Sequence, residues 1–74
     1  MMSLDQVRCG HWVKVMRVDT KPQLRQRLRD FGLVPGTRVR HRCASPGGHV
    51  VAIELRGSVL ALRKKDLQCI WVRL

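Results

Sequence analysis

The second half of the chain alternates between two kinds of side chain with the period of a β-strand. In residues 37–43 every second position is an arginine, and residues 50–55 place Val51, Ile53 and Leu55 on a common face. Arg56-Gly57-Ser58 follows directly, and a short glycine-containing link between two such runs is typical of a tight hairpin into residues 59–62. This half therefore predicts short strands joined by turns.

A single helix, at about residues 22–31, is predicted between strands. Pro22 suits the first helical position and Thr20 is placed to cap it, while Gly32 suits the left-handed residue that closes a helix. Pro35-Gly36 then favours a type II turn. The apolar positions recur at i, i+4 and i+7 and are expected to face the core; they are Leu24, Leu28 and Phe31.

Two short helical turns and two further strands complete the predicted elements. Ser3 and Gln6 have the spacing of a capping box, which predicts a turn near residues 3–7. A second turn is expected near residues 64–68, with strands at residues 11–18 and 69–72. Five short strands and one inserted helix predict a mainly β protein, folded as a small, closed or nearly closed barrel.

The size and charge of the chain favour a binding module over an enzyme. Its 74 residues form one domain, residues 1–74, with a thin core and little room for a deep cleft. Fifteen basic residues, eleven of them arginine, face five acidic ones, which gives a net charge of +10. Such an excess favours an anionic partner: nucleic acid, a membrane surface or an acidic protein face.

The cysteines and the N-terminus predict a cytoplasmic protein. Cys9, Cys43 and Cys69 are odd in number and widely spaced, unlike a disulfide framework. The first residues lack the apolar stretch of a signal peptide. No apolar run approaches the roughly 20 residues that span a bilayer.

Three segments together resemble the FeoA family. Residues 28–36, Leu-Arg-Asp-Phe-Gly-Leu-Val-Pro-Gly, are similar to its L-x-x-[LF]-G-L-x-P-G signature. Residues 53–63, Ile-Glu-Leu-Arg-Gly-Ser-Val-Leu-Ala-Leu-Arg, resemble a second segment of that family, and residues 3–7 with Gly10 match its usual start. The resemblance covers essentially the whole chain, in order and at the family's spacings.

The resemblance implies a fold and a function. The fold would be a small five-stranded SH3-like barrel. The function would be that of a cytoplasmic accessory or regulatory protein of ferrous iron uptake. Its partner would be the cytoplasmic GTP-binding domain of a FeoB-type membrane transporter, which would recruit the chain to the inner face of the cell membrane. Related domains form the C-terminal part of some metal-responsive transcription repressors, but this chain lacks the helix-turn-helix portion that such repressors need. The family has no agreed catalytic residues, so none is carried over, and no cofactor is expected.

A stripe of arginines is the main candidate for partner binding. Strand geometry places Arg38, Arg40 and Arg42 on one face, about 6.5–7 Å apart. The competing interpretation is a solvated strand face. Trp12 and Trp71 could grip a partner segment or could close the edges of the barrel. Further basic residues that could join the stripe are Arg25, Arg29, Lys64 and Lys65.

Chemistry at the thiols and imidazoles is the weaker alternative. No carboxylate is placed to orient a Cys–His pair for catalysis, and the X-x-X spacings are unlike those of a dedicated metal site. The sequence leaves an adventitious or dimer-bridging divalent metal open, as it does a homo-oligomer. The weak candidates for metal ligation are Cys9, His11, His41, Cys43 and His49.

A small basic nucleic-acid-binding barrel is the alternative function. Only Trp12, Phe31 and Trp71 are aromatic, and Phe31 is expected in the core. A single-strand binder normally presents a stacking platform of aromatic rings. The sequence therefore favours a protein partner over nucleic acid.

Overall fold

The chain folds into one six-stranded antiparallel sheet with a helix inserted between its second and third strands. The structure is a computed structural model that describes residues 1–74. Its elements are β1 (Met2–Ser3), the 3-10 helix η1 (Leu4–Gln6), β2 (Trp12–Val18), α1 (Pro22–Asp30), β3 (Arg38–Ala44), β4 (Val50–Leu55), β5 (Ser58–Arg63), α2 (Lys64–Leu67) and β6 (Ile70–Arg73). The strands lie in the order β1-β6-β2-β3-β4-β5, and every neighbouring pair is antiparallel.

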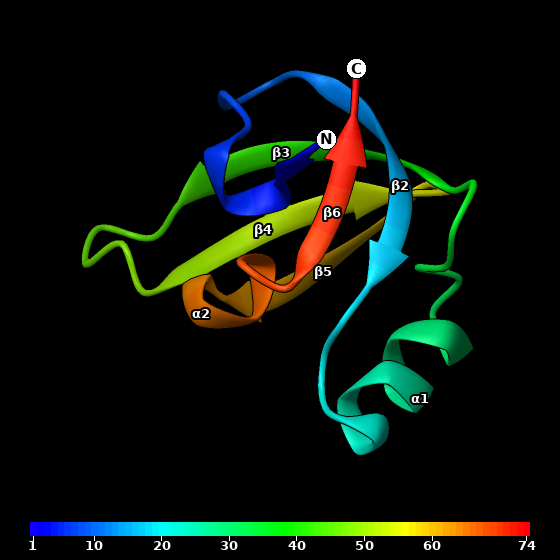
Figure 1. Ribbon diagram of the computed structural model, residues 1–74. Helices are drawn as coiled ribbons and strands as arrows, with labels where there is room; N and C mark the ends of the chain where they lie inside the picture. The colour runs from blue at the N-terminus through cyan, green and yellow to red at the C-terminus, as the bar shows by residue number, and fades with distance from the viewer.

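The sheet curls over on itself and encloses its apolar face. Figure 1 shows β2 and β6 crossing in front of β3, β4 and β5, with α1 beyond one end of β2 and α2 beside β5. Register shifts between Val15 and Arg17 on β2, and between His41 and Ala44 on β3, interrupt the ladders. Such bulges increase the local bend and twist of a strand, which suits a sheet that curls into a barrel.

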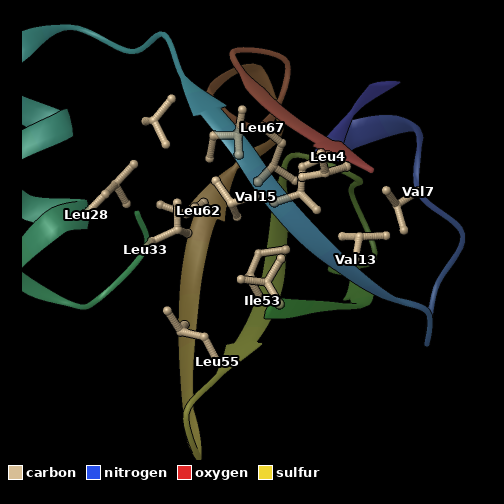
Figure 2. Packing of buried hydrophobic residues seen from close by; sticks show 14 of the residues in the cluster. Leu4, Val7, Val13, Val15, Leu28, Leu33, Ile53, Leu55, Leu62 and Leu67 are labelled. Carbon is tan, nitrogen blue, oxygen red and sulfur yellow. The ribbon is translucent and has the colours of Figure 1, made fainter. Parts of the chain in front are cut away.

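Alternate residues of the strands fill the space inside the curl. Val13 and Val15 of β2 are almost fully buried, as is Ile53 of β4. Figure 2 shows these side chains turned toward one another, with Leu28 and Leu33 at one end of the cluster and Val7 at the other. Burying an aliphatic side chain contributes roughly 1.5–3 kcal/mol, so this single cluster stabilises the domain. Its fifteen members are Leu4, Val7, Val13, Val15, Val18, Leu28, Leu33, Val39, Val51, Ile53, Leu55, Leu62, Leu67, Ile70 and Val72.

The hairpin between β4 and β5 is as tight as predicted. Leu55 pairs with Ser58, so only Arg56 and Gly57 form the turn. Both have positive φ, 49° and 79°, as a type I′ turn requires. This turn matches the right-handed twist of the two strands and sets their register.

The predicted end of α1 is also confirmed. The Leu33 N–H donates to the Leu28 carbonyl and the Gly32 N–H to the Arg29 carbonyl, with Gly32 at φ 92°. These two bonds are those of a Schellman motif, in which the residue after the glycine packs on the last turn of the helix. Gly36 then has φ 97° and the Thr37 N–H donates to the Val34 carbonyl, which makes the expected turn into β3.

Four expectations about individual elements were wrong. The sheet has six strands because Met2 and Ser3 pair with Val72 and Trp71 of β6, a contact too short to show in a sequence pattern. Neither Ser3 nor Thr20 provides a capping bond: Ser3 precedes η1 without a side-chain hydrogen bond, and the residue before α1 is Lys21. Phe31 lies past the last turn of α1 and is 57% exposed.

Candidate functional site

Three cations lie side by side across the outer face of the sheet. On β2, Lys14 is the register partner of Arg38 on β3 and of Arg73 on β6. Their neighbours Val13, Val39 and Val72 are buried, so these three side chains point away from the core and are exposed. We call Arg73, Lys14 and Arg38 the basic row.

No acidic side chain of the protein neutralises the basic row. None of its three side chains forms an ion pair or a side-chain hydrogen bond. Like charges directly opposite each other on neighbouring strands destabilise a sheet, by a few tenths of a kcal/mol to about 1 kcal/mol per pair. The row therefore lowers the stability of the free protein and leaves three cationic side chains available to an anion.

The other two arginines of the predicted stripe are partly occupied. Arg40 Nη2 lies 2.6 Å from Glu54 Oε1, and the Arg40 guanidinium lies 5.4 Å from the centroid of the Trp12 ring. Arg42 Nη1 lies 3.7 Å from the same Glu54 oxygen. One carboxylate thus offsets part of the charge of Arg40 and Arg42, while Arg38 on the same strand keeps its full charge.

A second Trp–Arg contact lies on β6 and β2. Trp71 Nε1 donates to Asp19 Oδ2 at 3.1 Å, and Arg17 Nε donates to the same oxygen at 2.7 Å. The Arg17 guanidinium is 5.8 Å from the Trp71 ring centroid. Both tryptophans therefore hold an arginine on the surface, an arrangement worth roughly 0.5–1 kcal/mol at exposed sites.

The basic residues of the two helices are separate from the β3 arginines. Arg25 and Arg29 of α1 border a hollow of about 280 Å³ that also contains Arg17 and Pro35. Lys65 of α2 borders another, of about 510 Å³, with Lys21 and Arg27 among its other lining residues. Neither hollow includes a β3 arginine. Lys64 is exposed on α2.

The proposed metal ligands do not gather into a site. No three or more His, Cys, Asp or Glu side chains come close enough together to hold a metal ion. His41 is buried with Nδ1 unpartnered, whereas His11 and His49 are exposed. Cys9 and Cys43 affect each other: hydrogen bonding with the Cys43 side chain is the main cause of a raised pKa at the Cys9 thiol.

Lys14 and Arg73 were missed by the sequence analysis. Alternation places Lys14 on the opposite face from Val13 and Val15, so its exposure could have been inferred. Its position between Arg38 and Arg73 could not, because it depends on the register of two ladders, one of which contains a bulge. Neither α1 nor α2 could serve as a membrane-crossing helix.

The curled antiparallel sheet and its inserted helix define a small domain with the SH3-like fold. Its candidate site is an exposed basic face rather than a cleft. Residues 2–74 match the family model of the FeoA domain, and the chain belongs to the FeoA family.

Solved structures agree with this assignment. The FeoA protein from Chlorobium tepidum is 29% identical, with a TM-score of 0.95 over 99% of this chain and 70% of that one. A FeoA-like protein from Clostridium acetobutylicum is 32% identical, with a TM-score of 0.84 over 99% and 85% of the two chains. A crystal structure described as iron uptake regulatory protein (FeoA) is 25% identical, with a TM-score of 0.81 over 97% and 93%. Among curated proteins, none matches the sequence.

Proposed function

We propose that this protein is an accessory or regulatory component of ferrous iron uptake that acts by docking on another protein. Membership of the FeoA family and the similarity to a protein described as an iron uptake regulator support the link to iron. The partner in this proposal is the cytoplasmic GTP-binding part of a FeoB-type membrane transporter. The protein would then work in the cytoplasm, at the inner face of the membrane.

The basic row is the observation that carries the docking proposal. Three unpaired cations in register destabilise the free sheet, and an acidic partner surface would relieve that repulsion. Arginine also suits paired hydrogen bonds to carboxylates. We therefore assign the basic row as the centre of the docking face, with Arg40 and Trp12 beside it.

The predicted stripe is accordingly revised. Arg38 remains in the docking face, whereas Arg40 and Arg42 contribute less charge because they share Glu54. Arg25, Arg29, Lys64 and Lys65 are proposed to lie outside the face, since they are on the helices.

Recovery of partners from membranes tests the function. The tagged protein is incubated with detergent-solubilised membranes of its own organism, and bound proteins and nucleic acid are identified. We expect the transporter with the wild-type protein and much less of it with Lys14→Ser/Arg38→Ser/Arg73→Ser. Recovery of nucleic acid without the transporter, with binding that falls steeply as salt rises, would favour the nucleic-acid-binding alternative.

A further inference from the structure

Two of the three cysteines lie on neighbouring segments at the same end of the sheet. Cys9 belongs to the segment that leads into β2, and Cys43 lies near the end of β3. The Gly10 N–H donates to the His41 carbonyl, and the His41 N–H donates to the His11 carbonyl. These bonds hold the segment around Cys9 against β3.

The backbone at Gly10 explains how Cys9 reaches this place. Gly10 has φ 91°, and His41 accepts a backbone bond from Gly10 and donates one to the next residue, His11, which is the pattern of a bulge with glycine at its first position. The bulge turns the chain just before β2 and places Cys9 next to the end of β3. An L side chain rarely adopts this backbone conformation, so the glycine is required here.

Both thiols are free and exposed, and the backbone bonds of Gly10 and His11 with His41 bring them to the same end of the sheet. Neither cysteine is in a disulfide, and both are open to solvent, whereas Cys69 is half-buried. Hydrogen bonding with the Cys43 side chain raises the pKa of the Cys9 thiol above its ordinary value, and the nearby Arg42 and Arg40 guanidinium groups oppose that rise. A thiol kept beside a second sulfur is placed for exchange, because the second sulfur can capture a mixed disulfide on the first.

We propose that Cys9 and Cys43 form a reversible dithiol site that is oxidised to an intramolecular disulfide by a low-molecular-weight disulfide. One cysteine thiolate attacks a sulfur of the oxidant, forms a mixed disulfide and releases the first thiolate of the oxidant. The second cysteine, deprotonated, attacks the protein sulfur of the mixed disulfide and releases the other thiolate. Two electrons pass to the oxidant, which leaves as two thiols after taking up the two cysteine protons. A reducing thiol reverses both steps.

The bond would tie the segment before β2 to β3, next to Arg40 and Arg42 of the outer face. A link between residues 9 and 43 closes a long loop, and such a link stabilises a domain mainly by restricting its unfolded state. The oxidised protein should therefore unfold at a higher temperature than the reduced one.

Thiol counting with glutathione disulfide as the probe tests the site. The folded protein is incubated in glutathione buffers of increasing oxidised fraction, quenched with acid, and analysed by thiol titration and peptide mapping. We expect the wild-type protein to lose two of its three thiols and to yield a peptide linking Cys9 to Cys43. A reducing thiol should restore both.

Single-cysteine variants provide the controls. Cys69→Ser should still form the linked peptide, whereas Cys9→Ser and Cys43→Ser should give only mixed disulfides with glutathione. Circular dichroism of the reduced variants checks that each is folded. A wild-type protein that retains three thiols, forms only mixed disulfides, or links Cys69 in preference would overturn the proposal.

Discussion

Arg38 and Arg40 are two residues apart on one strand face, yet their surroundings differ. Arg40 has a carboxylate at 2.6 Å and an indole ring beneath its guanidinium, and its side chain is 35% exposed. Arg38 has Lys14 opposite it and no acidic neighbour within ion-pairing distance. Of the two, Arg38 is the better candidate for binding, because its repulsion from Lys14 destabilises the free sheet and no acidic side chain offsets it.

Lys14→Glu should stabilise the free protein while weakening partner binding. The change converts two like-charge pairs, with Arg38 and Arg73, into opposite-charge pairs. Because all three side chains are exposed, we expect a gain of only about 0.5 kcal/mol in the free energy of unfolding at low salt. Urea denaturation at low and high ionic strength measures it. The free energy of unfolding of Lys14→Gln should fall between those of the wild type and Lys14→Glu. A loss of stability in Lys14→Glu would contradict the arrangement of the row.

At the scale of elements, α1 shows that a helical stripe in a sequence need not be a buried stripe in a structure. Leu24, Leu28 and Phe31 have the spacing of a single helical stripe. Only Leu28 is fully buried, however, and Phe31 is 57% exposed. The helix ends at Asp30, so Phe31 is the C-cap residue that precedes the glycine turn. Beyond the last helical residue the 3.6-residue period no longer decides which side chain faces the core.

Truncation of these residues should separate the two interpretations of the stripe. Leu28→Ala should lower the free energy of unfolding by about 3 kcal/mol because it leaves a cavity between α1 and the sheet. Phe31→Ala should lower it by less than about 1 kcal/mol, as expected for a largely exposed side chain. Thermal and urea denaturation of both variants measures the difference. Equal losses would mean that Phe31 is part of the core after all.

Turn chemistry and strand alternation accounted for most of the predicted elements. Gly32, Gly36 and Gly57 each occupy a positive-φ position that residues with a side chain rarely adopt, so the local structure around them could be predicted. The missing strand β1 has two residues and is ordered by pairing with β6. Pairing between segments so far apart in the chain leaves no local pattern.

At the scale of the whole molecule, the net charge of +10 predicted an anionic partner but could not locate the docking face proposed above. The sheet order β6-β2-β3 brings Arg73, Lys14 and Arg38 together from three separate parts of the chain. Arg25 and Arg29, which are just as basic, lie on a helix instead. The position of the candidate site therefore depends on sheet topology and strand register, whereas its positive charge depends on composition.

Calorimetric titration of the purified protein into the cytoplasmic GTP-binding part of the transporter tests the central claim most directly. The comparison is between Lys14→Glu/Arg38→Glu/Arg73→Glu and a helix control with the same charge change, Arg25→Glu/Arg27→Glu/Arg29→Glu. Reversing charges at the centre of an electrostatic interface costs several kcal/mol, so the row variant should bind at least about 100-fold more weakly. The helix control should stay within about threefold of wild type, because its charges lie outside the face and are screened by salt. Equal weakening of both variants, or full affinity in the row variant, would contradict the account.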